Sequence, residues 1–278
     1  MRFTKMHGLG NDYVYIDALE QEVRDPPALA IAMSRPHFGV HADGLVLIEA
    51  SATDDFAMRM FNADGSEGEM CGNAARCIGK YVYDRGITRK TRLTLATRAG
   101  RRTLELDVED GRVARVRVDM GEPALAPARI PVRLLGERAV GVPLEAAGGS
   151  VRITCVSMGN PHAVIFVDDP SATDIATIGA AIENHALFPD RTNVEFVRVA
   201  RRDLLEMRVW ERGSGETLAC GTGAAAALVA AVLEDRADRA ARIRLAGGEL
   251  QVSWEAGDNR VYQTGPAAFV FDGVWLGD

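Results

Sequence analysis

Two cysteines in matching surroundings are the residues of this sequence best suited to chemistry. Cys71 lies in FNADGSEGEMCGNAARC and Cys220 in WERGSGETLACGTGA, so each thiol precedes a glycine that opens a helix-forming run. The N–H groups at the start of a helix can stabilise a thiolate. Because the ordinary pKa of a cysteine is about 8.5, one thiol can serve as a base while another serves as an acid. Two such thiols could remove a proton from one face of a stereocentre and return one to the other face.

An internal repeat relates the two cysteines. They are 149 positions apart, and this offset aligns six identical residues over eighteen positions, where composition alone predicts roughly one. The same offset brings Gly10–Asn11 onto Gly159–Asn160. We therefore predict an N-terminal domain of residues 1–120, completed by residues 266–278, and a C-terminal domain of residues 121–265.

The elements that must position the thiols are mostly strands. Short β-branched runs dominate the sequence. Helices are predicted at Pro27–Arg35, Gly72–Asp84, Ile175–Phe188 and Thr222–Leu233. The last of these is apolar on all sides and is expected to be buried inside a curled sheet. A final strand, Phe269–Leu276, is expected to return and pack on the first half. These elements indicate an α+β fold with two pseudo-symmetric halves.

Composition and charge limit the partners. The net charge is −7 at pH 7 and the basic residues are scattered, which argues against nucleic acid. The longest apolar run is too short to span a bilayer and the first residues lack a secretory pattern, so we expect a cytoplasmic protein that does not enter a membrane. Cys77 and Cys155 are interpreted as small core residues. Neither CxxC spacing nor paired histidines accompany the cysteines, so no metal is expected.

Further polar residues recur near the thiols at repeat-related positions. Four asparagines lie at strand–loop junctions, where a lone asparagine is usually turn chemistry: Asn11, Asn62, Asn160 and Asn193. Their recurrence beside both cysteines favours a shared binding cleft. His162 and Glu211 are the titratable groups nearest these loops in the sequence, although His162 could simply fill space and Glu211 could simply pair with Arg212.

These motifs resemble the diaminopimelate epimerase family over nearly the whole chain. The resemblance is carried by MHGLGNDYVYID, the two cysteine motifs, VSMGNPHAV and RTNVEFV. It implies two pseudo-symmetric domains, each a curled, largely antiparallel β-sheet or barrel around a central helix, with the active site between them. It also implies a homodimer, a small-molecule substrate (diaminopimelate) and no cofactor, since the family works without pyridoxal phosphate.

The resemblance also assigns roles to residues. Cys71 and Cys220 would be the acid–base pair that interconverts LL- and meso-2,6-diaminopimelate. The backbone at Gly72–Asn73 and Gly221–Thr222 would hold the reacting carboxylate. The rest of the substrate would be positioned by Asn11, Asn62, Asn160, Asn193 and Arg212. His162 and Glu211 would tune the cysteines and contact the reacting amino group.

Two departures from the family pattern concern the segment GVHADGL. The family usually has glycine where this chain has His41, so that turn is expected to differ in shape. Some members carry glutamine in place of Gly44, so a side-chain contact to substrate is expected to be absent here. Two other functions remain open: a cofactor-independent racemase of another amino acid, such as proline or hydroxyproline, and a binding protein without turnover.

Overall fold

The computed structural model describes residues 1–277 and divides the chain into two compact units. The first unit comprises Met1–Asp119 and the C-terminal segment that begins at Thr264. The second unit comprises Met120–Gln263. Within residues 1–277, no helix has the length and apolar character needed to cross a membrane.

The described part of the first unit contains nine strands and two helices, although the end of one strand, β8, belongs to the second unit. Its strands are β1 (Arg2–Gly8), β2 (Asn11–Asp17), β3 (Gly44–Glu49), β4 (Phe56–Asn62), β5 (Glu67–Gly68), β6 (Arg92–Ala96), β7 (Arg102–Glu109), β8 (Arg112–Gly121) and β18 (Ala268–Val274), and its helices are α1 (Pro26–Ser34) and α2 (Gly72–Asp84).

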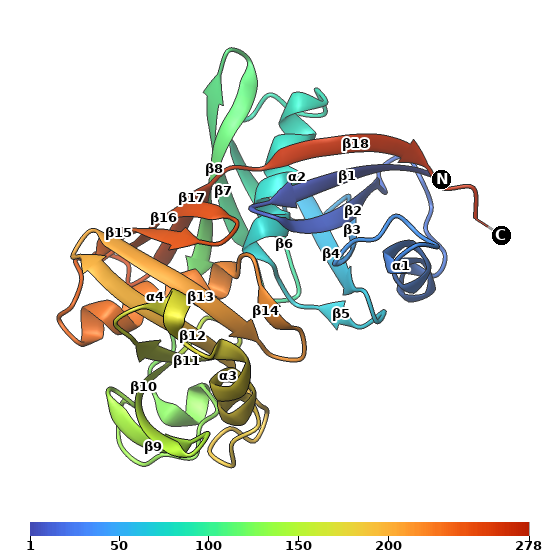
Figure 1. Cartoon of the computed structure of the whole chain (residues 1–278). Coiled ribbons are helices and arrows are strands. Elements are labelled where there is room, and N and C mark those ends of the chain that lie inside the picture. Colours follow the sequence, from blue (N-terminus) through green and yellow to red (C-terminus); the bar gives the residue numbers. More distant parts are fainter. Residues whose placement is uncertain (278) are drawn as a thin grey trace. The chain divides into compact units, whose positions relative to one another are not determined.

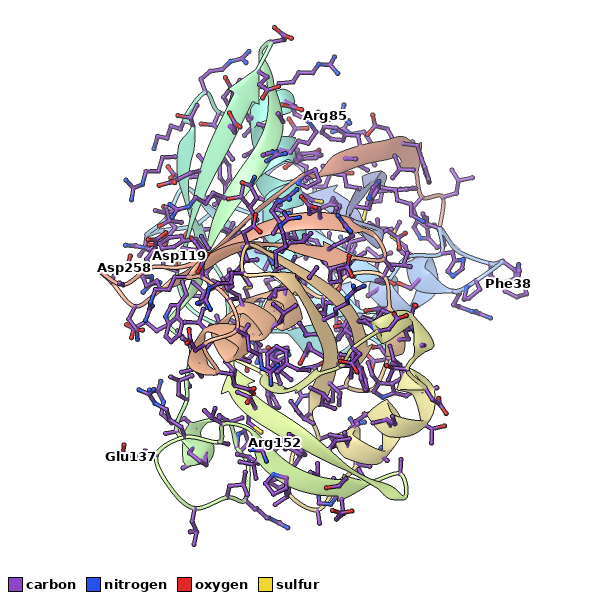
Figure 2. All side chains as sticks on the ribbon, turned by 60° about the vertical axis from the view of Figure 1, so that its left-hand side comes forward. Phe38, Arg85, Asp119, Glu137, Arg152 and Asp258 are labelled. Carbon is purple, nitrogen blue, oxygen red and sulfur yellow. The ribbon has the colours of Figure 1, made fainter. Side chains whose placement is uncertain are left out.

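The sheet of the first unit is mixed but largely antiparallel. β2 pairs antiparallel with β1 and parallel with β3, and β4 pairs antiparallel with β3 and parallel with β6. β18 pairs antiparallel with β1, and Figure 1 shows these two strands side by side although they come from opposite ends of the chain. Arg85, at the end of α2 and labelled in Figure 2, bonds to Asp272 of β18 and lies 4.9 Å from the Phe269 ring centroid.

The second unit has the other nine strands, two α-helices and two 3-10 turns. Its strands are β9 (Val142–Ala146), β10 (Gly149–Ser157), β11 (Pro161–Phe166), β12 (Asn193–Arg201), β13 (Leu204–Glu211), β14 (Gly215–Thr217), β15 (Ala240–Leu245), β16 (Gly248–Trp254) and β17 (Val261–Gly265). Its helices are α3 (Ile175–Glu183) and α4 (Gly221–Leu233), and its 3-10 turns are η1 (Pro127–Arg129) and η2 (Pro170–Ala172).

The second unit repeats the pairing order of the first. β11 pairs antiparallel with β10 and parallel with β12, and β13 pairs antiparallel with β12 and parallel with β15. The shared succession of strands explains why one ungapped offset relates the two halves of the sequence. The α+β fold class predicted from the sequence is confirmed.

Helix α4 is the apolar centre of the second unit. It packs against strands from β10 to β13 and against β15 and β16. Every residue from Ala224 to Ala231 is buried. Burying one Leu or Val side chain contributes about 1.5–3 kcal/mol, so Leu228 and Val229 fix this helix in place. The prediction of a buried helix here is confirmed.

One predicted helix is wrong at its end. The sequence predicted a helix from Ile175 to Phe188, but α3 ends at Glu183. Asn184 caps it, because both its backbone N–H and its side-chain amide donate to the carbonyl of Ala180. This local hydrogen bonding is the usual way in which asparagine competes with helix continuation.

Candidate active site

Cys71 stands at the beginning of the central helix of the first unit. It is the N-cap residue of α2, with φ −133° and ψ 122°, and its thiol is partly exposed. The extended backbone of this residue lets the helix begin at Gly72. The first N–H groups of any α-helix lack intrahelical acceptors, so those of Gly72 and Asn73 suit a carboxylate.

Asn11 connects the thiol to the sheet. It is the first residue of β2, and its Oδ1 atom accepts hydrogen bonds from Cys71 Sγ at 3.6 Å and from Asn73 Nδ2 at 3.1 Å. Its own Nδ2 atom donates to Asp43 Oδ2 at 2.7 Å. Burial, followed by the neighbouring Asp12, raises the pKa of Asp43. Three residues predicted for the site, Asn11, Cys71 and Asn73, are therefore brought together in this unit.

A buried arginine supports this group and was not predicted from the sequence. Arg76 is fully buried, donates to Asn73 Oδ1 at 2.6 Å and donates to the Pro266 carbonyl at 3.1 Å. Room for it comes from Gly8, where a Cβ atom would lie 3.0 Å from the guanidinium. Burial lowers the pKa of Arg76, but arginine remains charged in proteins. A charged residue between Ala75 and Cys77, on a buried helix face, was the available signal.

Asn62 is the last residue of β4 and pairs with Gly44, the residue after Asp43. It is exposed, and its side-chain amide donates to Ser66 Oγ at 3.0 Å. His41 adopts φ +61°, a left-handed conformation that suits glycine, and the difference in turn shape from the family stays a prediction. At Gly44 a Cβ atom would lie 2.0 Å from the carbonyl oxygen of Phe61, so a side chain does not fit there.

Cys220 stands at the beginning of the central helix of the second unit. It is the N-cap residue of α4 and is 5% exposed. Its Sγ atom accepts a hydrogen bond from the Gly223 N–H at 3.3 Å and lies 3.5 Å from Thr222 Oγ1. Burial raises the pKa of Cys220 well above its ordinary value, and the charges of Glu211 and Glu195 raise it further. The hydrogen bonds from Thr222 and Gly223 at the helix N-terminus lower this pKa, but burial and the two carboxylates outweigh them.

His162 is held between two oxygen atoms. Its Nδ1 atom lies 2.7 Å from Glu195 Oε1, and its Nε2 atom lies 2.9 Å from Asn160 Oδ1. The Asn160 amide donates in turn to Thr222 Oγ1 at 3.3 Å. His162 and Glu195 are both fully buried. The interpretation of His162 as simple filling is therefore wrong, because the ring bonds to two polar neighbours.

Glu195 was not predicted from the sequence. The signal was a single carboxylate inside the strand run NVEFV, all five residues of which are buried. A buried carboxylate requires compensating partners. Its Oε1 atom has His162, while its Oε2 atom is buried with no hydrogen-bond partner among the described residues.

Glu211 and Arg212 form hydrogen bonds with other residues of the second unit rather than the simple pair considered from the sequence. Glu211 Oε1 accepts a hydrogen bond from the Thr217 hydroxyl, and Arg212 donates to the Asp190 carbonyl at 3.0 Å. Burial raises the pKa of Glu211, whereas hydrogen bonds from Thr217 and Cys220 lower it. Glu211 therefore lies next to the Cys220 thiol.

Asn193 holds in place the segment that contains Glu211 and Arg212. Its side-chain amide donates to the Pro161 carbonyl at 2.9 Å, and its Oδ1 atom accepts from the Arg212 N–H at 2.9 Å. Asn193 is 3% exposed, so in this structure its amide serves the protein backbone. Eight predicted residues are brought together in this unit: Asn160, His162, Asn193, Glu211, Arg212, Cys220, Gly221 and Thr222.

The two remaining cysteines are core residues, as predicted. Cys77 and Cys155 are 0% and 1% exposed, and burial raises the pKa of each thiol to about 12. Among residues 1–277, no three His, Cys, Asp or Glu side chains gather where they could hold a metal ion.

Comparison with known proteins gives full-length matches to one family. The profile described as diaminopimelate epimerase matches residues 3–126 and 154–270. A diaminopimelate epimerase from Acetivibrio thermocellus is 55% identical over 98% of this chain and 98% of its own length. One from Methanococcus maripaludis is 50% identical over 98% of this chain and 99% of its own length.

Solved structures share the fold at low sequence identity. A hydroxyproline epimerase from Agrobacterium vitis has a TM-score of 0.75 at 15% identity and covers 98% of this chain and 91% of its own. A probable proline racemase from Agrobacterium radiobacter has a TM-score of 0.73 at 16% identity, covering 99% of this chain and 93% of its own. At these identities the likeness concerns the fold alone.

Proposed function

The chain belongs to the diaminopimelate epimerase family, and on that premise we propose that it is an isomerase that interconverts LL- and meso-2,6-diaminopimelate with two cysteines. Cys71 and Cys220 would exchange the α-proton from opposite faces of the substrate carbon. One thiol would act as base and the other as acid, with their roles reversed in the reverse direction.

One observation carries this proposal. Each unit places a cysteine at the N-cap of its central helix, at positions related by the repeat offset. Simple core packing does not require a thiol at the same helix start twice. The helix N-terminus beside each thiol also offers backbone N–H groups that could hold the reacting carboxylate and stabilise the charge that develops on it.

Burial makes Cys220 an acid in the absence of substrate. Its raised pKa keeps it as a thiol, so it is ready to donate a proton. For catalysis in the other direction it must lose its proton, and Glu211 lies beside it with a pKa that burial also raises. Glu211 would then accept a hydrogen bond or the proton from the Cys220 thiol. In this way it would adjust the acidity of Cys220, as expected from the family resemblance.

The other predicted residues would recognise the substrate. Arg212 is exposed, and its planar guanidinium can bind a second carboxylate with two hydrogen bonds. Asn11, Asn62, Asn160 and Asn193 would supply amide contacts to the polar groups of the substrate. Asn193 would do so after exchanging one of its present backbone partners.

Deuterium labelling tests the two-base mechanism. In deuterated water with LL-diaminopimelate, the product should carry deuterium at the α-carbon while substrate recovered early stays largely unlabelled. Equal labelling of both pools would contradict a two-base mechanism. Cys71→Ala and Cys220→Ala should each abolish epimerisation while the circular dichroism spectrum is retained, and turnover by either variant would refute the assignment.

An amino-acid panel tests the substrate. We expect turnover of diaminopimelate and none of proline or hydroxyproline, measured by chiral chromatography, because a substrate with one carboxylate leaves Arg212 without an ionic partner. Tight binding of diaminopimelate with no α-proton exchange would instead identify a binding protein.

We also propose a homodimer. Three large apolar side chains of β18 are about half exposed or more: Val270 at 51%, Phe271 at 47% and Val274 at 63%. A second copy of this chain would cover them. Light scattering should give twice the monomer mass, and Val274→Glu should reduce it; a monomeric wild-type protein would refute the dimer.

A further inference from the structure

Four hydrogen-bond contacts connect a buried carboxylate to the Cys220 thiol. Glu195 bonds to His162 at 2.7 Å, His162 to Asn160 at 2.9 Å, Asn160 to Thr222 at 3.3 Å, and Thr222 Oγ1 lies 3.5 Å from Cys220 Sγ. All five residues belong to the second unit. We call this series the Glu195 relay.

The direction of each hydrogen bond in the relay follows from its chemistry. Both nitrogens of His162 face oxygen atoms, so with Glu195 as a carboxylate both contacts are hydrogen bonds only when the ring carries two protons. The Asn160 amide then accepts from the ring through Oδ1 and donates through Nδ2 to Thr222. With its oxygen accepting from Asn160, the Thr222 hydroxyl has one proton left, and Cys220 Sγ is the acceptor beside it.

A ring with one proton would reverse the relay. If only Nδ1 were protonated, Nε2 would need a donor, and the Asn160 amide would rotate to present its NH₂ group to the ring. Its Oδ1 atom would then accept the Thr222 hydroxyl proton, which would be withdrawn from Cys220. The negative charge of Glu195 is the feature of this site that favours the doubly protonated ring, because the two fully buried groups then form an ion pair.

The surroundings of Glu195 are adapted to a carboxylate at this place. At Gly223 of α4 a Cβ atom would lie 2.7 Å from Glu195 Oε1, so the absence of a side chain makes room for the oxygen. The carboxylate thus lies against the first turn of α4, where the helix dipole favours negative charge. Its second oxygen is buried without a hydrogen-bond partner among the described residues, so packing alone does not account for a glutamate here.

We propose that Glu195 is a positioning residue for Cys220: its carboxylate keeps the His162 ring doubly protonated, and the relay thereby directs the Thr222 hydroxyl proton to Cys220 Sγ. The Thr222 hydroxyl and the Gly223 N–H then form a pair of donors to the thiolate. These two donors oppose the burial and the Glu211 and Glu195 charges, which raise the pKa of Cys220. This inference rests on the proposed function of Cys220 as acid and base.

Nuclear magnetic resonance tests the protonation of the ring without any assay of activity. In protein labelled with ¹⁵N-histidine, long-range ¹H–¹⁵N spectra distinguish a doubly protonated ring from either neutral tautomer. The chain has five histidines, and the signals of His162 are those missing from His162→Asn. We expect two protonated nitrogens at pH 7 in the wild type and one in Glu195→Gln. A wild-type ring with a single proton would overturn the proposal, even where the variant does not fold.

Kinetics test whether the relay acts on Cys220. Glu195→Gln should lower kcat by roughly 10–100-fold, the range for loss of an orienting partner, with KM little changed. Thr222→Val keeps the backbone N–H and removes the last donor of the relay, so Glu195→Gln should cost little more in that background. Full additivity of the two losses would show that Glu195 does not act through Thr222.

A matched control uses another carboxylate in contact with α4. Glu234 follows the last residue of that helix and accepts a hydrogen bond from Thr154 at 2.5 Å. Glu234→Gln should leave kcat and the His162 spectrum unchanged, and a loss equal to that of Glu195→Gln would refute a specific role. Activity in Cys71→Ala or Cys220→Ala would refute the proposed function, whereas the His162 spectrum is independent of that result.

Discussion

Replacement of Gly223 by alanine sets two physical effects of opposite sign against each other. Gly223 lies in the first turn of α4, and alanine is favoured over glycine within a helix by up to about 1 kcal/mol. The added Cβ atom would lie 2.7 Å from Glu195 Oε1 and 3.3 Å from Cys220 Sγ. A separation below 3 Å forces the contacted group to shift, which is easy only for the far end of a flexible apolar side chain. Here the carboxylate or the helix must move.

The structure indicates which effect is larger. Glu195 is fully buried, so its carboxylate moves only by weakening its bond to His162. A hydrogen bond to a charged group contributes about 1.5–3 kcal/mol. After subtraction of a helix gain of about 1 kcal/mol, Gly223→Ala should destabilise the protein by about 0.5–2 kcal/mol. Because the displaced groups belong to the relay and to Cys220, kcat should also fall by roughly 10-fold or more.

Urea unfolding and steady-state kinetics measure the two effects on the same preparation. A matched control is Gly79→Ala in α2, where the new Cβ would meet only apolar side chains, Leu106 at 2.9 Å and Val116 at 3.4 Å. That variant should change stability by less than about 1 kcal/mol and leave kcat unaltered. If Gly223→Ala proves more stable than the wild type with unchanged kcat, the close packing of Glu195 against α4 is refuted.

Three further predictions follow from buried groups. Arg76→Met should lower stability by about 3 kcal/mol in urea unfolding, because the asparagine and carbonyl oxygens that it contacts lose a buried charged donor, and a change below 1 kcal/mol would contradict this. Stability should fall as pH rises from about 9 to 12, because the unfolded chain releases the protons of Cys77 and Cys155 near the ordinary pKa of a thiol, while the fold raises the pKa of each to about 12. Cys77→Ala should lose part of that slope, about 1.4 kcal/mol per pH unit, and an unchanged slope would contradict the raised pKa. Gly44→Gln should destabilise the protein by more than 3 kcal/mol through its clash with the Phe61 carbonyl, and wild-type stability would show that the strand can shift.

The sequence was most informative where function and local structure coincide. Cys71 and Cys220 were recognised because the glycine after each one marks a helix start, and both prove to be N-cap residues. The apolar run of α4 predicted a buried helix because no face of it could contact water. In these cases a few consecutive residues carry all the information that is needed.

Contacts set by strand pairing could not be predicted in this way. β11 and β12 pair in parallel, with His162 opposite Asn193, and this register brings Glu195 within reach of the imidazole. The two residues are 33 positions apart, and nothing in the sequence between them indicates the register. Arg76 was missed for the same reason, since its partner Pro266 comes from the other end of the chain.

The repeat predicts equal positions for the two thiols but not equal chemistry. The offset of 149 places Glu211 opposite Asn62, Thr222 opposite Asn73 and Ala225 opposite Arg76. Cys71 therefore has an amide acceptor and a buried cation nearby in its unit, whereas Cys220 has two carboxylates and a hydroxyl. Nearby carboxylates favour the thiol form, as they do at Cys220. The duplicated backbone thus fixes where each sulfur lies, and the residues at which the two halves differ decide which charged and polar groups surround it.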